Sequence, residues 1–589
     1  MSEAPRAVIR AGCFFAEVVL KVWKTASFNE SLAESIMAEY GLPHPVAAVL
    51  AARPWDSPED IGRFLSPSLS SLGDPFVLPD MDKAVKRIWA AIRDRQTIVI
   101  YGDYDVDGVT STAMLCRVLR ALGAEVQLFL PHRVDDGYGM SVEPVMRCIE
   151  DFKPGLIVTV DCGTGSREAV EYARSRGVDV VVTDHHEVSG DISPAWALVN
   201  PKLGKRPEDK MLAGVGVAYK LCHALVKHGR DAGEDSAKEA DLREYLDLAA
   251  LGTVCDIVPL LHENRILVRA GLERLARTGN PGLKALLEVA EVKQPYTAYT
   301  FGFQLGPRLN AAGRLGTAMH SLNLLLTEDA AEAGVLAKDL DRTNRERRSI
   351  ENQIFEEAAA MIAEKYDEKK TYGIVAAGRE WNQGVVGIVA SRLVKKFNRP
   401  AIVIAVDEDG RGKGSCRSIA GFNMVEQLEH CSKILTRWGG HAMAAGLELP
   451  VDRIEEFGEQ FNRIAEKALR HADLRPSITI DAWLEPGEFS AQLHEAQKKL
   501  EPFGMENPSP LWGLRDVAVS GNPRMVGTGH VKFALQINGA SVPAICFGWG
   551  DRPLPAGRLD LAFQMKLNSF RGNDTLEMDV KAIRSSAAE

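Results

Sequence analysis

Short apolar runs alternate with segments of helical periodicity between residues 97 and 184. Runs rich in Val and Ile that are separated by helices are typical of βαβ units, which build a parallel sheet. The expected strands are Thr97–Tyr101, Glu125–Leu130, Leu156–Asp161 and Val178–Asp184, and the expected helices are Thr110–Leu122, Ser166–Arg176 and one from Ala240 towards Asp256. We therefore predict an α/β domain with a parallel sheet over residues 83–325.

Two helical regions flank this domain. Residues 23–82 are polar, show helical periodicity and contain several prolines that would interrupt helices, so we predict a small helical cap behind an extension at residues 1–22. Residues 326–368 contain no proline and have a composition that favours helix. They predict one long connector helix from Ala330 to about Tyr366.

Two further units follow the connector. Residues 369–470 return to a strand–helix–strand pattern, with strands at 372–377 and 401–406 and a helix at 384–397. Residues 475–589 contain short β-runs at 516–520, 531–537 and 559–566, a spacing that predicts a small all-β barrel or sandwich. The fold class is therefore α/β, with two α/β domains joined by a long helix and a β domain at the end.

The composition is that of a soluble globular protein of several domains. Among 589 residues, 46% are apolar and 25% are charged, which excludes a disordered or fibrous chain. No uninterrupted apolar run reaches the length of a membrane-spanning helix. The nine cysteines are scattered without a C-x-x-C pair, which favours reduced, buried thiols in a cytoplasmic protein.

The net charge of −10 argues against a protein that coats nucleic acid through bulk positive charge, although local binding stays possible. The charge is unevenly distributed. Residues 101–270 carry −8, whereas residues 371–450 carry +3. The acidity therefore lies mainly in the parallel-sheet domain, where bound divalent ions would offset part of it.

Asp103, Asp105 and Asp107 occupy alternate positions just beyond a predicted strand. Open α/β sheets bind ligands at the carboxyl ends of their strands, and alternate side chains of an extended segment point the same way. Clustered carboxylates suit Mg²⁺ or Mn²⁺, and the helix expected after Gly108 could accept a phosphate at its N-terminus. The alternative is an acidic turn in solvent.

Three later segments add further candidate ligands. Asp161 follows one predicted strand, and Asp184, His185 and His186 follow the next. Asp256 lies in an apolar stretch, where an unpaired carboxylate would be costly. Each signal is modest alone, since a strand-end Asp often caps a helix. Together they supply enough ligands for two divalent ions that share a carboxylate, an arrangement suited to displacement at phosphorus.

The motifs resemble a known superfamily. Asp105-x-Asp107, Asp161, Asp184-His185-His186 and Asp256 match in order the four motifs of the DHH phosphoesterases. Residues 439–446 (GGHAMAAG) are similar to the GGH motif of the domain associated with them. Residues 101–111, 306–314 (GPRLNAAGR) and 501–510 (EPFGMENPSP) resemble the RecJ family of bacterial 5′→3′ exonucleases specific for single-stranded DNA.

The resemblance implies roles for these residues and an oligonucleotide-binding (OB) fold for the last domain. Asp105 and Asp107 would each contact a metal, Asp161 would bridge two, and His185 with Asp256 would complete the second. His186 would face the scissile phosphate. Some relatives have a metal-binding His where Tyr101 stands, so the first metal has fewer protein ligands or Asp103 fills the gap. The metals would be Mn²⁺ or Mg²⁺.

Candidate phosphate contacts lie in both α/β domains. Ser415 and Arg417 belong to a glycine-rich stretch of the second domain, and His441 in the GGH motif is expected at a helix start. Arg133, Arg308 and Arg314 are further candidates, especially for a 5′-terminal phosphate. The aromatics at 296, 299, 301 and 303 could stack on bases or pack in a core.

The resemblance thus predicts a metal-dependent 5′→3′ exonuclease of single-stranded DNA that acts in repair and recombination. A single-strand DNA-binding protein and a repair helicase are the expected partners, and the protein is expected to be a monomer. The alternative is a related phosphodiesterase of short oligonucleotides or cyclic dinucleotides. The length of 589 residues and the additional β domain speak against that alternative.

Overall fold

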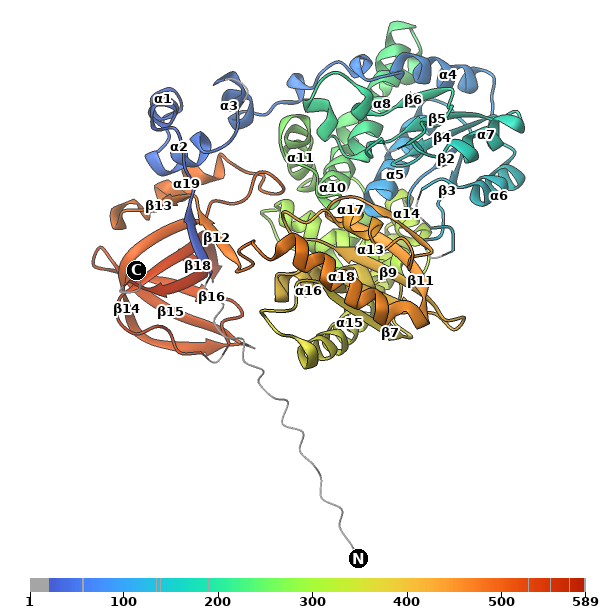
Figure 1. The fold of residues 1–589 in the computed structure, drawn as a ribbon. Coiled ribbons are helices and arrows are strands. Elements are labelled where there is room, and N and C mark those ends of the chain that lie inside the picture. Colours follow the sequence, from blue (N-terminus) through green and yellow to red (C-terminus); the bar gives the residue numbers. More distant parts are fainter. Residues whose placement is uncertain are drawn as a thin grey trace, which may run out of the picture.

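A parallel sheet of five strands forms the centre of the first α/β domain. The computed structural model describes residues 21–586 except 56–57, 134, 138, 189, 528, 551 and 571–572. The strands pair in the order β3-β2-β4-β5-β6, as Figure 1 shows at the upper right. Their bounds are β2 Ile98–Tyr101, β3 Val126–Phe129, β4 Leu156–Val160, β5 Asp179–Thr183 and β6 Ala197–Val199. Four of the five strands were predicted, and β6 was missed.

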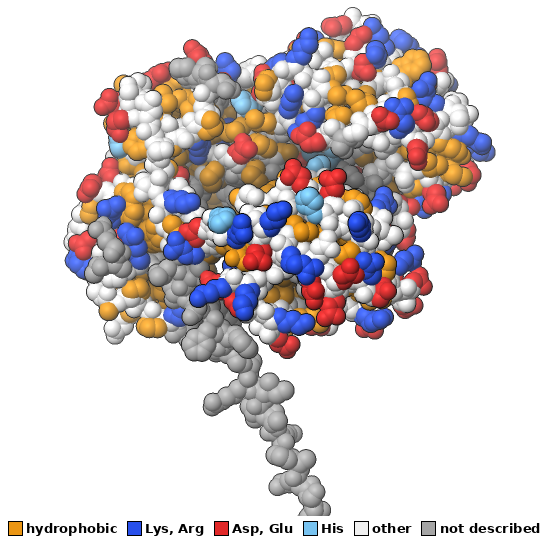
Figure 2. Space-filling model, viewed as in Figure 1, with side chains coloured by type: hydrophobic (Ala, Val, Ile, Leu, Met, Phe, Trp, Pro, Cys, Tyr) orange, Lys and Arg blue, Asp and Glu red, His pale blue; other side chains and the backbone are white. Residues whose placement is uncertain are grey.

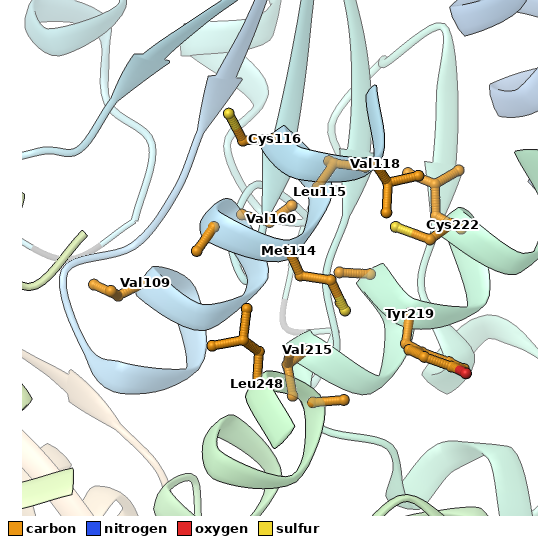
Figure 3. Packing of buried hydrophobic residues seen from close by; sticks show 14 of the residues in the cluster. Val109, Met114, Leu115, Cys116, Val118, Val160, Val215, Tyr219, Cys222 and Leu248 are labelled. Carbon is orange, nitrogen blue, oxygen red and sulfur yellow. The ribbon is translucent and has the colours of Figure 1, made fainter. Parts of the chain in front are cut away.

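Alternate residues of β2 point to opposite faces of this sheet, and both faces are covered by helices. Ile98 and Ile100 pack in a large core with α4 (Met81–Arg93), α5 (Val106–Ala121) and α8 (Gly214–Asp231). Val99 and Tyr101 pack with α6 (Val142–Phe152) and α7 (Arg167–Ser175). Figure 3 shows α5 between the sheet and the helices that follow it, with Met114 and Val215 in the shared core.

Helices complete the domain below the sheet. Helix α10 (Leu246–Cys255) packs against α5, α8 and α11 (His262–Leu275), so the predicted 240–256 helix begins later than expected. The other helices are α9 (Asp235–Glu239), α12 (Pro281–Val289), a π-helical turn η6 (Thr300–Leu305), α13 (Gly306–Leu315) and α14 (Met319–Leu326). The connector is one helix, α15 (Ala330–Lys365), as predicted.

The second α/β domain has a mixed sheet in the order β10-β11-β9-β8-β7. Helices α15 and α16 share a core with one face, and α17 and α18 share a core with the other. Only β7 and β8 are parallel neighbours. The bounds are β7 Ile374–Arg379, α16 Val386–Phe397, β8 Ala401–Val406, β9 Arg411–Arg417, α17 Met424–Glu429, β10 Arg437–Gly440, β11 Ala444–Pro450 and α18 Ile454–Leu469.

The C-terminal domain is a closed barrel. Strands β14, β15, β16, β18 and β17 pair in this order, and β17 returns to β14. A barrel is therefore present, one of the two outcomes that the β-pattern allowed. The bounds are β12 Ser477–Ile480, β13 Ala482–Trp483, α19 Ala491–Lys498, β14 Trp512–Val526, β15 His530–Ile537, β16 Ala540–Cys546, β17 Leu559–Phe570 and β18 Asn573–Ser585.

The N-terminal cap differs from its prediction. Residues 22–25 form a strand, β1, which pairs in parallel with β12, and they are not part of a helix. Helices α1 (Glu30–Tyr40), α2 (His44–Ala51) and α3 (Pro58–Leu65) share one core with the barrel domain. Figure 1 shows these blue helices above the red barrel, although more than 400 residues separate them. The sequence could not indicate this pairing because β1 has only four residues.

Two findings bear on the cell-biological expectations. No helix within the described residues is long and apolar enough to cross a membrane. Cysteines 116, 148, 162, 222, 255, 416, 431 and 546 are all free thiols in the described part of the chain, and all but Cys255 are buried. The predicted extension at residues 1–22 lies almost wholly outside the described residues.

Candidate active site

The predicted metal ligands meet at the carboxyl edge of the parallel sheet. Asp103 and Asp105 follow β2, Asp161 follows β4, and His185 follows β5. Asp256 arrives from the C-terminal end of α10. Parallel strands present their carboxyl ends at one edge, so Asp103 and His185, 82 positions apart, become neighbours, and α10 adds Asp256.

His185 lies at the centre of the cluster. Its Nε2 atom is 3.2 Å from Asp161 Oδ1, 3.6 Å from Asp256 Oδ2 and 3.8 Å from Asp107 Oδ2. The ligand atoms of Asp107, His185 and Asp256 form one potential metal-binding group, and those of Asp103, Asp105 and Asp161 form another. Asp161 also groups with His185 and His186, so it lies between the two sets.

Helix N-termini hold two of the carboxylates in place. Asp105 is the N-cap of α5 and accepts hydrogen bonds from the backbone N–H groups of Asp107 and Gly108. Asp107 lies in the first turn of α5, and its two oxygens accept the N–H groups of Gly214 and Val215 at the start of α8. Helix N-termini favour negative charge, which fixes both side chains without neutralising them.

This arrangement corrects two expectations. Helix α5 begins at Val106, four residues earlier than predicted, so Asp107 is helical and does not continue an extended segment with Asp103 and Asp105. The first N–H groups of α5 are already bonded to Asp105, so this N-terminus is not the expected phosphate site. The N-capping preference of Asp explains the earlier start.

Backbone geometry brings Asp161 close to α8. Asp161 has a φ of 63°, a left-handed conformation that Asp tolerates better than most residues. A Cβ atom on Gly214 would lie 2.6 Å from Asp161 Oδ1, closer than non-bonded atoms approach. Glycine at position 214 therefore lets α8 begin directly against the shared carboxylate.

The donor set fits divalent cations. Asp103 Oδ1, Asp161 Oδ1, His185 Nε2 and Asp256 Oδ2 are buried atoms that have no hydrogen-bond partner among the described residues. Buried polar atoms are otherwise almost always paired. Four such atoms from four segments, all directed into one small region, are explained by cations that they would coordinate. Oxygen ligands with one imidazole suit Mn²⁺ and Mg²⁺.

The electrostatics of the metal-free cluster point the same way. Burial, and then the charge of Asp105, raise the pKa of Asp103 to about 8 and that of Asp107 to about 7. Burial and neighbouring carboxylates also raise the pKa values of Asp161 and Asp256 well above the usual range. Burial lowers the pKa of His185 to about 3, which keeps its Nε2 lone pair available as a ligand.

Asp184 and His186 form a separate pair beside the cluster. Asp184 Oδ1 accepts the N–H groups of His185 and His186 and lies 2.7 Å from His186 Nδ1, and Thr164 donates to Oδ2. Burial opposes protonation of His186, but the hydrogen bond and charge of Asp184 outweigh it and raise the pKa. Asp184 thus orients the His186 imidazole, whose Nδ1 lies 3.9 Å from Asp161 Oδ1.

Tyr101 does not join the ligands. Its ring is buried and stacks on Phe129 at a centroid distance of 5.1 Å, within the core on the α6 and α7 face. Burial raises the pKa of its hydroxyl far above neutrality, so it is not a phenolate ligand. Asp103 occupies the corresponding part of the cluster.

A basic pocket lies where the two α/β domains meet. Tyr104 and Arg133 line it from the first domain, and Lys413 and Ser415 of β9 with Glu448 of β11 line it from the second, around a cavity of about 220 Å³. Figure 2 shows the surface hollowed along this boundary, with His side chains (pale blue) close to it. Residues from two domains therefore converge beside the carboxylate cluster.

Three arginines crowd this boundary. Arg133 stacks on Tyr104, Arg314 donates to the Gly384 carbonyl oxygen, and Arg417 donates to Ser415 Oγ. Burial, and then the charges of Arg133 and Arg347, lower the pKa of Arg314 to about 9. Arg308 pairs with Asp341, whereas no ion pair within 4 Å involves these three arginines in the described part of the chain. Arg314 nevertheless lies within the electrostatic influence of Asp105. Unneutralised guanidinium groups at one boundary suit a phosphate.

Two predicted phosphate contacts have other surroundings. Arg308 donates to Asp341 of α15 at 2.9 Å and to the Gln304 carbonyl oxygen, so its guanidinium is already engaged. His441 lies in the turn between β10 and β11, and the expected helix start there is wrong. The alanines of the GGH motif favour a helix, but its glycines lie in the antiparallel hairpin formed by β10 and β11. His441 is exposed, and its role as a contact stays a prediction.

Sequence analysis missed several residues at this site. The Gly214 and Val215 N–H groups, Lys413 and Gln383 were not predicted. Asn310 was also missed, although it lies in the GPRLNAAGR segment, and its side chain accepts the Val106 N–H at the start of α5. The AGVG segment at 213–216 was the available signal, since clustered glycines indicate close backbone approach.

Comparisons with known proteins match the architecture. Residues 97–253 match the model of the DHH family N-terminal domain, residues 348–467 the DHHA1 domain, and residues 480–582 the RecJ OB domain. The Bacillus subtilis protein named single-stranded-DNA-specific exonuclease RecJ is 36% identical over 95% of this chain and 70% of its own. The Escherichia coli protein of the same name is 38% identical over 86% of this chain and 90% of its own.

Solved structures agree with these matches. A crystal structure of RecJ in complex with Mn²⁺ from Thermus thermophilus superposes with a TM-score of 0.82 at 32% identity, covering 96% of this chain and 80% of that one. The Mg²⁺ complex from the same organism has a TM-score of 0.75 at 31% identity and covers 96% and 79%. Sequence identity, domain order and fold therefore agree, and the chain belongs to the RecJ family.

Proposed function

We propose that this protein is a metal-dependent exonuclease that hydrolyses single-stranded DNA from its 5′ end. The observation that carries the proposal is the position of two carboxylate-rich groups, which meet where Asp161 lies 3.2 Å from His185, beside a cavity lined by Arg133 and Lys413. The RecJ relatives are named single-stranded-DNA-specific exonucleases, and one has been crystallised with Mn²⁺ and with Mg²⁺. The alternative, a phosphodiesterase of short oligonucleotides or cyclic dinucleotides, is distinguished by the assay below.

Two metal ions would be held by this chain's own ligands. Asp103, Asp105 and Asp161 would hold one, and Asp107, His185 and Asp256 the other, with Asp161 contributing to both. Bound divalent ions lower the pKa of water and stabilise negative charge on phosphate oxygens. The α5 and α8 N-termini hold the carboxylates of Asp105 and Asp107 in position.

His186 would stabilise the reacting phosphate. Asp184 holds its Nδ1 and raises its pKa, which favours the protonated imidazole beside the cluster. The His186 side chain is partly exposed beside the cluster. A fixed cation at this point favours the more highly charged transition state over the substrate.

The arginine pocket would bind the 5′ terminus. Arg133 and Ser415 line a cavity of about 220 Å³, and Arg314 and Arg417 contact its wall through Gly384 and Ser415. A pocket that binds the terminal phosphate would hold the 5′ end and would set the polarity. We expect the boundary between the two α/β domains to be too narrow for a duplex and to admit a single strand.

The setting follows from the activity. An enzyme of this kind would act in DNA repair and recombination in the cytoplasm, on single strands that a helicase exposes and a single-strand DNA-binding protein covers. The barrel domain, which matches the RecJ OB model, would contribute further binding to the strand. We expect the protein to be a monomer.

A labelled-strand assay tests the proposal. The full chain is incubated with Mn²⁺ and with single-stranded or blunt duplex DNA that carries a label at its 5′ or 3′ end. We expect rapid release of the 5′ label from single strands and little from duplex. Release from the 3′ end, or equal degradation of blunt duplex, would contradict the proposal. The same incubation is repeated with short oligonucleotides and with cyclic dinucleotides. Activity confined to those substrates would support the alternative.

A further inference from the structure

Two large aromatic side chains face solvent from the turn before α13. Tyr299 and Phe303 are 62% and 70% exposed. Their rings stack on each other with centroids 4.8 Å apart and an angle of 15° between the planes. The pair therefore presents a flat aromatic surface to solvent, whereas Phe301 between them is fully buried. Core packing explains Phe301 but does not explain its two neighbours.

The turn that carries the pair is attached to the metal centre. Tyr299 precedes η6, and Phe303 lies within it. The Cys255 thiol donates to the Phe301 carbonyl oxygen at 3.6 Å, and Gly302 lies against Val254. Val254 and Cys255 form the last turn of α10, immediately before Asp256. Figure 1 shows α10 and α13, the two helices that η6 contacts, where the two α/β domains meet.

The chemistry of this surface fits a nucleobase. Residues 294–307 contain no charged side chain, so nothing there repels a phosphate backbone. Ile257, which follows Asp256, is itself 65% exposed and extends the apolar character towards the metal ligands. A single strand carries unpaired bases, and aromatic stacking holds them without sequence preference. A π-helical turn is rare and is frequently found at functional sites.

We propose that Tyr299 and Phe303 form a stacking platform for a nucleobase of the bound single strand. The inference rests on the proposed function and names the part of the substrate that this surface binds. Phosphates would be held by the arginines and the metals, whereas the platform would bind a base. The platform would stack on any of the four bases, as a nuclease that degrades strands of arbitrary sequence requires.

Binding to base-containing and abasic strands separates the platform from the phosphate contacts. Affinity is measured without divalent ions, so that strands stay intact, for oligodeoxythymidylate and for an abasic oligomer of equal length. We expect Tyr299→Ala and Phe303→Ala to weaken binding of the thymidylate about five- to one-hundred-fold. The same variants should bind the abasic strand as the unaltered protein does, and Phe303→Trp should retain binding.

Trp196→Ala is the matched control. Trp196 is 54% exposed and precedes β6, so it lies at the amino edge of the sheet, opposite the metal ligands. This variant should bind both strands normally. Melting temperatures of all variants should stay unchanged, because the altered side chains are exposed.

The possible outcomes distinguish the platform from the proposed function. Normal thymidylate binding by Tyr299→Ala and Phe303→Ala would overturn the platform, as would an equal loss for the abasic strand. A surface used only for a partner protein would give the first of these results. If the unaltered protein with Mn²⁺ does not degrade single strands, the proposed function fails. If it degrades them while both variants bind normally, only the platform fails.

Discussion

The carboxylate cluster and the arginine pocket are adjacent but are built in different ways. The cluster is acidic, is buried and comes entirely from the first α/β domain, and helix N-termini and the Asp161 backbone hold it in place. The pocket is basic, is more open and combines the first domain with β9 of the second. The cluster is therefore complete within one domain, whereas the pocket depends on how two domains meet. We infer that the cluster catalyses hydrolysis and that the pocket selects which end of the strand is degraded.

Removal of the shared carboxylate should have the largest effect. Asp161→Ala should lower the turnover of single-stranded DNA at least about a thousand-fold, because both metal groups lose a ligand worth several kcal/mol in the transition state. Binding to the strand should largely remain, since the arginines are unchanged. Turnover and affinity are measured separately, with the exposed Asp235→Ala as control. Activity close to that of the unaltered protein would rule out a shared ligand.

Loss of an arginine beside the pocket should weaken recognition of the 5′ end of the strand. Arg417→Ala should reduce activity on a 5′-phosphorylated strand about ten- to one-hundred-fold, from the loss of a charge-assisted hydrogen bond worth about 1.5–3 kcal/mol. A strand with a 5′-hydroxyl should be affected much less. The ratio of kcat/KM for the two strands measures this difference. An equal loss on both would mean that Arg417 contacts the backbone and not the terminus.

Removal of the metals should make the stability of the protein depend on pH through the carboxylate cluster. Without metal, the raised pKa values of Asp103, about 8, and Asp107, about 7, mean that the folded chain retains protons that the unfolded chain releases near pH 4. The free energy of unfolding of the metal-free protein should therefore fall as pH rises from about 4 to about 8.

Divalent ions should reverse this loss. At pH 8, Mn²⁺ at one hundred times its Kd should add about 2.7 kcal/mol per site, seen as a higher unfolding midpoint in denaturant. Asp103→Asn should reduce the pH dependence of the metal-free protein. A stability that rises between pH 5 and 8 without metal would show that these carboxylates are paired by other groups.

The smallest change tests how closely α8 approaches Asp161. Gly214→Ala would place a Cβ atom 2.6 Å from Asp161 Oδ1, so we expect a destabilisation of about 1–3 kcal/mol together with weaker metal binding. Gly334→Ala is the control, because a Cβ at that point of α15 meets nothing within 4 Å. This second variant should be as stable as the original protein or slightly more so. Metal titrations of the two variants that coincide would contradict the role of Gly214.

The sequence predicts the layout of the parallel sheet better than the contacts at its edge. Valine-rich runs fixed four strands to within a few residues, because both faces of a parallel sheet are buried and its strands are uniformly apolar. The ligand residues were recognisable as motifs at strand ends. The early start of α5 was not recognised, since a strand-end Asp can be a metal ligand or a helix cap, and Asp105 is placed to be both.

Contacts between segments that are distant along the chain could not be predicted from the sequence. The N–H groups that hold Asp107 come from residues 107 and 108 positions later, and backbone groups leave no residue-type signal. Arg308 and Arg314 lie on one helix with the same chemistry, yet only Arg308 has a carboxylate, from α15, within reach. The pairing of β1 with β12 depends on the whole fold between them.

Anomalous scattering from crystals grown with Mn²⁺ tests the central claim most directly. We expect two strong peaks per chain at the carboxyl edge of the sheet, one near Asp103 and Asp105 and one near Asp107, His185 and Asp256, both within coordination distance of Asp161. The Asp161→Ala variant should weaken both peaks. A single peak remote from Asp161, or none at this edge, would contradict the account.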